Sequence, residues 1–271
     1  MDERPSEGIL SRLPLKYLEA GAGQGPAVVL LHGWGAFKEI WWGTLRALAP
    51  RFHAIALEWP GHGGSPGLEQ IGTVEDLAGL VELACVELGL DRVALVGHSM
   101  GGRVAALCAL DNPERIDRLV LIDAPLDPSH VAPIGHRLLD PRTVRRTVVA
   151  ARALGKGLPF VRPAPHDHRG GVVRTFLRRA RYHGMADPGA LTRYGKSLCE
   201  GSLASRLGEI RQPTLVVTGA GDRLVPARHA RFAAERIPNA ELRVIPRALH
   251  NPMDERPAEL DSVLLEFLNR D

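Results

Sequence analysis

The chain of 271 residues carries 34 Lys and Arg against 31 Asp and Glu, and 45% of its residues are hydrophobic. This length fits one large α/β domain, or a core with an inserted subdomain, and the apolar content is sufficient for a hydrophobic core. No apolar run reaches 18 residues, and the charged N-terminus lacks the apolar region of a secretion signal, so neither a membrane span nor a leader is expected. Three cysteines are an odd number that favours free thiols in a reducing compartment, which predicts a cytoplasmic enzyme.

The charge is unevenly distributed along the chain. Residues 126–212 contain 16 Lys and Arg against 6 Asp and Glu, whereas the remainder contains 18 against 25. This basic surplus suggests an anionic substrate or partner, such as an acyl carrier protein or an acyl-CoA, because opposite charges attract over long range. The alternative is a solvated helix surface. No nucleic-acid motif accompanies the arginines, so no nucleic-acid partner is expected.

Apolar, β-branched runs alternate with helical segments along most of the chain. In order, we predict an edge strand at 15–20, a buried strand at 27–31, a helix at 42–48, a strand at 53–57, a helix at 75–88, a strand before Ser99 and a helix after it, strands at 118–122 and 214–217, a helix at 227–236, a strand at 242–245 and a final helix at 258–268. This alternation predicts an α/β fold with a mostly parallel sheet and helices on both faces.

Residues 126–208 interrupt the alternation. They are predicted to form short helices at 142–154, 171–182 and 191–198, joined by Pro- and Gly-rich loops. We interpret 126–208 as a helical cap, or lid, inserted into an α/β core formed by 1–125 and 209–271. Because reactive groups collect at the carboxyl ends of parallel strands, the cap is expected to cover that side of the sheet.

The most informative stretch lies around Ser99. A β-branched strand ends in small residues and a helix begins at once, with Gly97 and Gly101 two positions on either side of the serine. Such a strained turn lifts the hydroxyl clear of the sheet and points helix N–H groups at a developing anion. A Gly-rich turn with an exposed serine is the alternative interpretation.

A serine hydroxyl is a poor nucleophile and needs a base, which a carboxylate must orient. His250, in a polar loop after the final strand, is the predicted base, and Asp222, in a Gly-rich loop, is the predicted acid. The order Ser, acid, His is the one expected for this architecture. Asp123 competes for the acid role because it also ends a core strand, and Asp254 is predicted to cap the last helix.

The oxyanion donors are predicted to be the backbone N–H groups of Met100 and Trp34, with Gly33 as the nearby alternative. His32 is expected to shape the same loop through hydrogen bonds, and His62 and His98 are expected to lie behind the reactive residues. Specifically, the side chain of His98 should point away if that of Ser99 points outward. A His-Asp-His run at 166–168 suggests a metal, but a solvated loop is favoured, so neither a metal nor an organic cofactor is expected.

Five motifs occur in a characteristic order: Leu-His-Gly-Trp-Gly at 31–35, Pro-Gly-His-Gly-Gly-Ser at 60–65, Gly-His-Ser-Met-Gly-Gly at 97–102, Gly-Ala-Gly-Asp at 219–222, and the late His250. Together they resemble the α/β-hydrolase superfamily. The resemblance implies the same roles for Ser99, Asp222, His250, Trp34 and Met100. Within that superfamily, the His-Gly-Trp-Gly loop and the helical cap of this chain are similar to those of small carboxylesterases such as the pimeloyl-carrier-protein methyl esterases.

The predicted function is therefore hydrolysis of a small-molecule carboxylic ester through an acyl-enzyme on Ser99. A C–C bond hydrolase and a cofactor-free perhydrolase remain alternatives, because they share the same three residues. A non-catalytic ligand-binding protein on the same fold is the alternative from another class. The serine at the nucleophile position disfavours haloalkane dehalogenase and epoxide hydrolase chemistry, as far as the resemblance extends.

Overall fold

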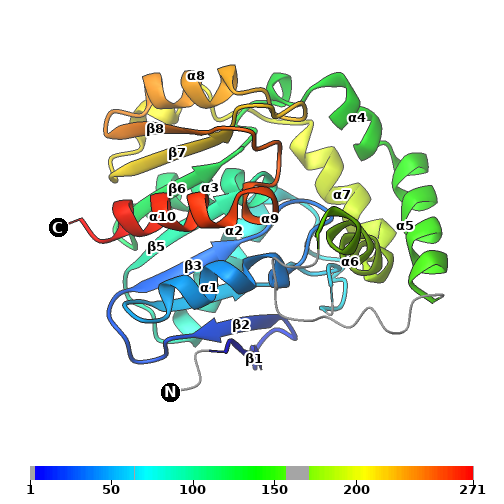
Figure 1. Cartoon of the computed structure of the whole chain (residues 1–271), viewed down its shortest axis with the longest axis horizontal. Coiled ribbons are helices and arrows are strands. Elements are labelled where there is room, and N and C mark those ends of the chain that lie inside the picture. Colours follow the sequence, from blue (N-terminus) through cyan, green and yellow to red (C-terminus); the bar gives the residue numbers. More distant parts are fainter. Residues whose placement is uncertain (1–3, 64, 157–170, 271) are drawn as a thin grey trace.

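The computed structural model describes residues 4–63, 65–156 and 171–270. Their strands form one eight-stranded sheet in the order β1-β2-β4-β3-β5-β6-β7-β8 (Figure 1). The β1–β2 and β2–β4 pairs are antiparallel, and all other neighbours are parallel. The strands are β1 (Ser6–Ile9), β2 (Lys16–Ala20), β3 (Ala27–Leu31), β4 (His53–Leu57), β5 (Val93–His98), β6 (Ile116–Ile122), β7 (Thr214–Gly219) and β8 (Ala240–Ile245). The predicted α/β class is confirmed.

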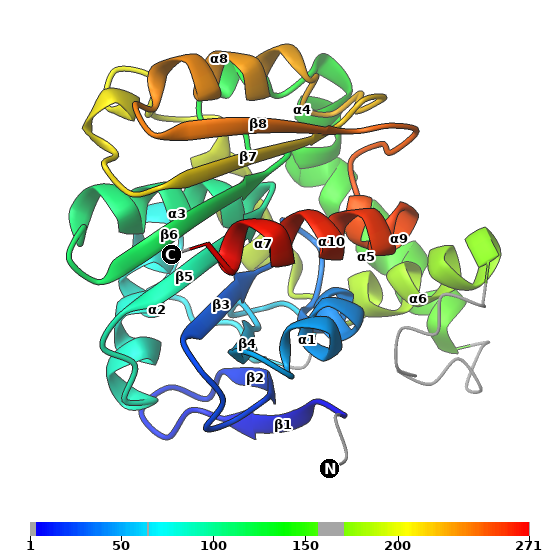
Figure 2. The same ribbon diagram turned by 60° about the vertical axis from the view of Figure 1, so that its left-hand side comes forward.

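Helices cover both faces of this sheet. Helices α2, α3 and α8 lie over one face, and α1 and α10 lie over the other (Figures 1 and 2). The core helices are α1 (Trp42–Leu48), α2 (Val74–Glu87), α3 (Met100–Asp111), α8 (Arg228–Arg236), α9 (Pro252–Glu255) and α10 (Pro257–Leu268), with 3₁₀ turns η1 (Lys38–Trp41) and η4 (Leu207–Glu209). Every residue of β3 and β5 is buried, as expected for central parallel strands covered on both faces.

Local sequence explains where several of these elements begin. Thr73 and Asp76 form a capping box at the start of α2: the Thr73 hydroxyl accepts from the Asp76 N–H at 3.0 Å, and the Asp76 carboxylate accepts from the Thr73 N–H at 2.9 Å. Pro257 begins α10, where its missing N–H costs no hydrogen bond.

Two predictions about elements are wrong. The strand at 15–20 is not an edge strand, because β1 pairs with its outer side. The short segment Ser-Glu-Gly-Ile is mostly exposed and shows no buried apolar face, so it gave no strand signal. Asp254 does not cap the last helix; it lies within α9, a short helix that was not expected.

A helical segment joins β6 to β7. We call it the α4–α7 segment; it comprises η2 (Pro128–His130), α4 (Pro133–Leu139), α5 (Pro141–Lys156), α6 (Gly171–Met185) and α7 (Pro188–Leu198). The three helices predicted here correspond to α5, α6 and α7, whereas α4 was not expected. The segment lies beyond the carboxyl ends of the parallel strands (Figures 1 and 2).

A small apolar core holds the α4–α7 segment together and joins it to the sheet. It contains Val144, Val148, Ala186 and Leu191, and Trp34 of the loop after β3 packs against it. The His-Asp-His run at 166–168 lies outside the described residues. Of the helices in the described part of the chain, none combines the length and apolarity needed to cross a bilayer.

Candidate active site

Ser99 occupies the sharp turn between β5 and α3. Its backbone has φ +52° and ψ −118°, a conformation that a residue with a side chain rarely adopts and that is strained. A Cβ on Gly97 would lie 2.3 Å from the Gly101 oxygen, and a Cβ on Gly101 would lie 2.3 Å from the Leu31 oxygen. Neither position has room for a side chain. The two glycines therefore let strand and helix approach closely enough to form this turn.

The structure brings Ser99, His250 and Asp222 into one hydrogen-bonded chain. The His250 Nε2 atom lies 3.1 Å from the Ser99 hydroxyl, and its Nδ1 atom lies 2.7 Å from Asp222 Oδ2. The Asp222 side chain is fully buried, and that of His250 is 14% exposed. Because Asp222 accepts at Nδ1, Nε2 is left unprotonated in the neutral ring and can accept the serine proton.

Close backbone contacts between two loops hold Asp222 next to His250. A Cβ on Gly219 would lie 2.0 Å from the Leu249 oxygen, so the end of β7 touches the loop that carries His250. The Gly221 N–H donates to the Ala248 oxygen at 2.9 Å. The glycines before Asp222 therefore allow the two loops to approach closely. This requirement explains why residues 219–222 form a recognisable motif.

Asp222 is held as a carboxylate. Its Oδ1 atom accepts from the N–H groups of Leu224 at 2.7 Å and Val225 at 3.0 Å. Burial would raise the pKa of Asp222, but the hydrogen bond and charge of His250, together with these two N–H groups, outweigh burial and lower it. An ionised carboxylate is the form that stabilises a cationic imidazole.

Asp123, the competing candidate, lies behind Asp222 rather than on His250. Its Oδ1 atom accepts from the Thr218 hydroxyl at 2.9 Å and the Gly219 N–H at 3.0 Å, whereas its buried Oδ2 atom has no partner that donates to it among the described residues. Burial and the neighbouring Asp222 raise the pKa of Asp123 well above its usual value. A proton on Oδ2 would satisfy that atom and remove the repulsion between the two carboxyl groups.

The loop after β3 lies against Ser99. A Cβ on Gly33 would be 3.0 Å from the Ser99 Cβ, so the loop that carries Trp34 passes against the serine. No described residue accepts a hydrogen bond from this N–H. Met100 is the first residue of α3, where an N–H has no partner within the helix. Met100 thus adjoins Ser99, Trp34 belongs to the loop that packs against it, and no described residue accepts a hydrogen bond from either N–H.

Buried histidines support this loop. The Gly35 N–H donates to His62 Nε2 at 3.1 Å, and burial lowers the pKa of His62 to about 3, so the ring stays neutral and can accept. His32 Nδ1 lies 2.9 Å from the Gly33 oxygen, and its Nε2 lies 3.1 Å from the buried Glu58 carboxylate. Both histidines contact the loop through its backbone, as the sequence predicts for His32.

His98 does not point away from the site, contrary to expectation. It lines the pocket beside Ser99, and its Nε2 atom donates to the His250 carbonyl at 2.7 Å. Burial, and then the nearby His250, lower the pKa of His98 well below its usual value, so it stays neutral. The ring therefore helps to hold the backbone of the His250 loop.

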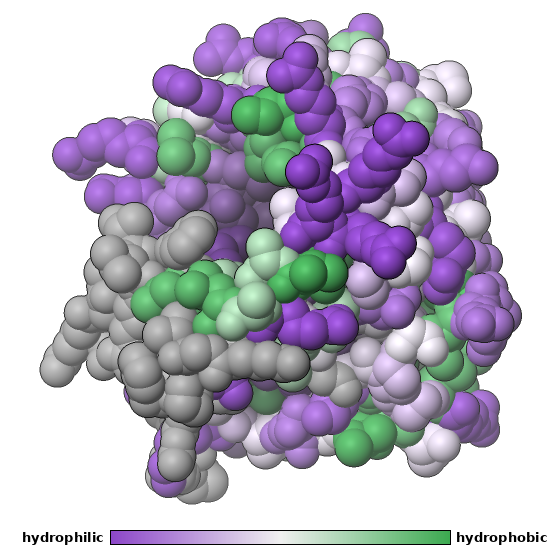
Figure 3. Space-filling view, turned by 90° about the vertical axis from the view of Figure 1, so that its right-hand side faces the viewer, coloured by the Kyte–Doolittle hydropathy of each residue, from purple (hydrophilic) through white to green (hydrophobic). Residues whose placement is uncertain are grey.

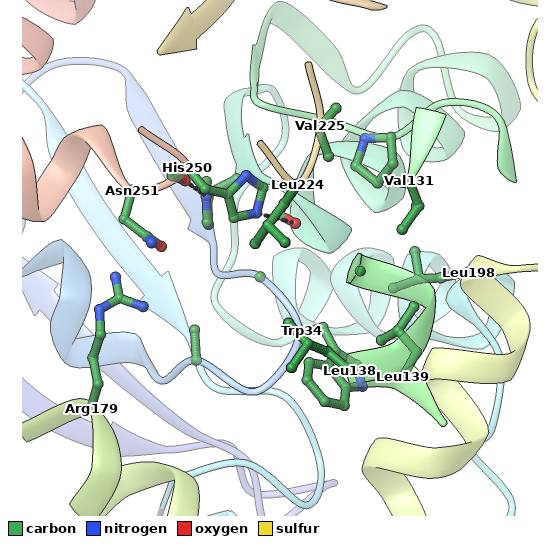
Figure 4. A pocket seen from close by; sticks show the side chains of 16 residues that line it. Trp34, Val131, Leu138, Leu139, Arg179, Leu198, Leu224, Val225, His250 and Asn251 are labelled. Carbon is green, nitrogen blue, oxygen red and sulfur yellow. Dashed lines mark hydrogen bonds between the residues drawn. The ribbon is translucent and has the colours of Figure 1, made fainter. Parts of the chain in front are cut away.

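A pocket of about 220 Å³ opens beside Ser99 and His250 (Figure 4). One part of its wall is apolar and comes mainly from the α4–α7 segment. Arg179 of α6 and Asn251, which follows His250, also line it. The sequence predicts a site role for neither residue. Adjacency to His250 could have indicated Asn251, but nothing in the sequence distinguishes Arg179 from its neighbouring arginines.

Among the described residues, one group has the composition of a metal site. Ligand atoms of His98, Asp123 and His250 lie within 4.8 Å of one another. Both ring nitrogens of His250 already contact Asp222 and Ser99, and His98 Nε2 contacts a backbone carbonyl. The residues present therefore fit a hydrogen-bonded chain better than a cation.

A serine on a strained strand-to-helix turn, with its partners at neighbouring strand ends, is typical of α/β proteins that carry nucleophilic sites. The chain belongs to the family described as the alpha/beta hydrolase fold, whose model matches residues 26–257. Membership of this family identifies the protein as a hydrolase-type enzyme and confirms the resemblance inferred from the motifs.

Individual relatives differ in the reaction for which they are named. The chain is 28% identical over 252 residues to a pimeloyl-[acyl-carrier protein] methyl ester esterase from Nitrosomonas europaea, covering 89% of this chain and 94% of that protein. It is 31% identical over 274 residues to a 2-hydroxy-6-oxononadienedioate/2-hydroxy-6-oxononatrienedioate hydrolase from Cupriavidus pinatubonensis, covering 92% and 89%. A solved hydrolase from Pseudomonas aeruginosa superposes with a TM-score of 0.79 at 26% identity, covering 100% of both chains.

Proposed function

We propose that the protein is a serine hydrolase that cleaves carboxylic esters through an acyl-enzyme on Ser99. The observation that carries this proposal is the hydrogen-bonded chain from the Ser99 hydroxyl through His250 to Asp222. The relative named as a methyl ester esterase gives further support, since it matches this chain over most of both lengths.

In the proposed reaction, His250 Nε2 accepts the Ser99 proton as the hydroxyl oxygen attacks the ester carbonyl. The N–H groups of Trp34 and Met100 stabilise the oxyanion. His250 then returns the proton to the departing alcohol, and a water attacks the acyl-enzyme by the same route. Asp222 stays ionised and stabilises the cationic ring. No metal or organic cofactor takes part in these steps.

Residues 126–208 act in this proposal as a cap over an α/β core formed by 1–125 and 209–271. Two contacts support the assignment. Side chains of α4 and α7 line the pocket, and the Trp34 indole N–H donates to the Leu191 oxygen of α7 at 2.8 Å. The cap would therefore shape the space for the substrate while the core supplies the reacting groups.

Turnover of p-nitrophenyl acetate and butyrate tests the reaction. We expect Ser99→Ala to reduce kcat by at least about 10⁴-fold and to abolish labelling by a fluorophosphonate probe, because the nucleophile is lost. Ser129→Ala, which changes an exposed hydroxyl, is the matched control and should retain activity. Equal rates for wild type and Ser99→Ala would remove the proposal, and a wild-type protein that does not react with the probe would favour a ligand-binding role.

C–C bond hydrolysis is the second candidate, because the relative from Cupriavidus pinatubonensis is named for it. The two reactions are separated by comparing kcat/KM for p-nitrophenyl butyrate with that for 2-hydroxy-6-oxononadienedioate. A preference of more than about 100-fold for the dioate would replace ester cleavage as the primary reaction.

An anionic acyl carrier is part of the proposal as a partner. The basic surplus in 126–212 supports it, and Figure 3, which faces the α4–α7 segment, shows hydrophobic patches among strongly hydrophilic side chains. Screening acts over about 8 Å at physiological salt, so kcat/KM for an ester attached to an acidic carrier protein should fall as salt rises. A salt response equal to that of a neutral ester would leave the arginines as a solvated surface.

A cytoplasmic location is also proposed, supported by the three free cysteines.

A further inference from the structure

The pocket beside Ser99 has two chemically different ends (Figure 4). Six apolar side chains form one end: Val131, Leu138, Leu139, Leu198, Leu224 and Val225. Arg179 and Asn251 lie at the opposite end, with His250 between the two groups (Figure 4). The apolar end suits a hydrocarbon group, whereas the guanidinium at the other end presents charged donors that an anionic group can use.

Arg179 is fixed in place by Asp254 of α9. Its Nε atom donates to Asp254 Oδ2 at 2.7 Å, and its Nη2 atom donates to the same oxygen. The Asp254 side chain is 3% exposed, whereas that of Arg179 is 29% exposed. The carboxylate therefore lies beneath the guanidinium and sets its orientation, so that little side-chain entropy is lost when a ligand binds.

The pairing leaves donors for a ligand. A guanidinium has five N–H groups, and the bonds to Asp254 use only those on Nε and Nη2. Nη1 has no hydrogen-bond partner among the described residues. The guanidinium points toward the Asn251 side chain in Figure 4. A planar guanidinium can donate to both oxygens of a carboxylate at once, as it can to those of a phosphate.

Asn251 places this end of the pocket beside the reacting groups. It directly follows His250 in the chain, and its side-chain amide makes no cap hydrogen bond to α9, which begins at the next residue. An anion that contacts both Arg179 and Asn251 would lie on one side of the scissile bond, while the apolar group of the substrate fills the other end.

We propose that Arg179, oriented by Asp254, forms with Asn251 a carboxylate-binding subsite, so that the preferred substrates are esters that carry a second, ionised carboxyl group. This inference deepens the proposed ester hydrolysis and rests on it. Arg179 acts as a specificity residue in this assignment; it takes no part in proton transfer.

The first test compares matched esters. Monomethyl glutarate and monomethyl adipate carry a free carboxylate, and methyl esters of fatty acids with the same number of carbons are their neutral counterparts. We expect Arg179→Met to lower kcat/KM for the charged esters at least about tenfold and for the neutral esters less than about threefold, since a hydrogen bond to a charged group is lost only with the charged esters. Arg179→Lys should retain part of the preference.

Arg145→Met is the matched control, because Arg145 is an exposed arginine of α5 outside the pocket. It removes the same charge from the same segment and should change the ratio of charged to neutral esters less than about twofold. An equal fall in kcat/KM for charged and neutral esters in Arg179→Met would overturn the subsite. An equal effect of Arg179→Met and Arg145→Met on the ratio of the two kcat/KM values would do the same. The Arg179–Asp254 pair would then only join α6 to α9.

A binding measurement separates failure of the subsite from failure of the proposed reaction. In the Ser99→Ala protein, calorimetry should show monomethyl glutarate binding at least about tenfold more tightly than methyl pentanoate, and adding Arg179→Met should remove the difference. Preferential binding without turnover in wild type would refute ester hydrolysis alone. Turnover of both esters without any preference would refute the subsite alone.

Discussion

The carboxyl edge of the sheet and the α4–α7 segment contribute to the same pocket in different ways. At the sheet edge, Ser99, Asp222 and His250 lie on turns where glycines allow backbones to approach within contact distance. In the α4–α7 segment, α4 and α7 offer apolar side chains and α6 offers Arg179. In the proposed reaction, the sheet edge supplies the proton-transfer groups, whereas the α4–α7 segment determines the shape and charge of the pocket.

The difference explains why one region can be recognised by a sequence motif and the other cannot. A turn with no room for a Cβ demands glycine at fixed positions, as at Gly97 and Gly101, so the edge has motifs. A pocket wall built from helices needs only apolar side chains of suitable volume, which many sequences supply. Changes at the edge should therefore alter the rate for every ester, whereas changes in the segment should alter the choice among esters.

The largest effect is expected at the edge. Asp222→Asn keeps the shape of the side chain but no longer holds His250 in the required tautomer, so kcat should fall about 10³- to 10⁴-fold. Asp123→Asn is the matched control, because Asp123 accepts from Thr218 and Gly219 rather than from His250, and the raised pKa of its carboxyl favours the neutral form that asparagine resembles. It should lower kcat less than about tenfold. The kcat of each variant is measured with p-nitrophenyl butyrate. A larger fall in kcat in Asp123→Asn than in Asp222→Asn would assign the acid role to Asp123.

An intermediate effect is expected at His62, beneath the loop after β3. Because its pKa in the folded protein is lowered to about 3, the unfolded chain gains a proton below about pH 6.5 that the folded protein does not. Stability should therefore fall as pH falls, by about 1.4 kcal/mol per pH unit for this group. His62→Gln keeps an acceptor for the Gly35 N–H and removes the titration.

Urea unfolding at pH 7.5 and pH 5.0 measures this effect. The loss of unfolding free energy between the two values should be about 2 kcal/mol smaller in His62→Gln than in wild type. His98, whose pKa is also lowered, and His130, whose pKa burial lowers to about 4, add to the wild-type loss but not to the difference between the two proteins. An identical pH dependence would show that His62 is not held neutral by burial.

The smallest effect is expected where the two regions are joined. Trp34→Phe removes the hydrogen bond to the Leu191 oxygen, which should lower the unfolding free energy by about 0.5–1.5 kcal/mol. Trp42→Phe is the control, because the buried Trp42 indole N–H has no partner among the described residues. If Trp42→Phe destabilises as much as Trp34→Phe, the bond between loop and α7 contributes nothing measurable.

Most of the fold, and the three residues that form the hydrogen-bonded chain, could be predicted from the sequence. Apolar runs such as those of β3 and β5 identify strands buried on both faces, and the glycines beside Ser99 and before Asp222 identify the two turns. Edge strand β1 and short helices α4 and α9 could not, because each has too few residues to show a periodic apolar pattern. The position of His98 was predicted wrongly, since it depends on where the His250 loop passes.

By itself, the sequence determined the α/β class, the order of its elements and the three residues proposed to react, because periodicity and obligatory glycines are local properties of a chain. Only the tertiary structure decided that Asp222 contacts His250 while Asp123 lies behind it. Only the tertiary structure distinguished Arg179 from the other arginines of the segment, because it places Arg179 in the pocket wall, bonded to the buried Asp254. Such choices depend on the packing of segments far apart in sequence, and no local pattern records that packing.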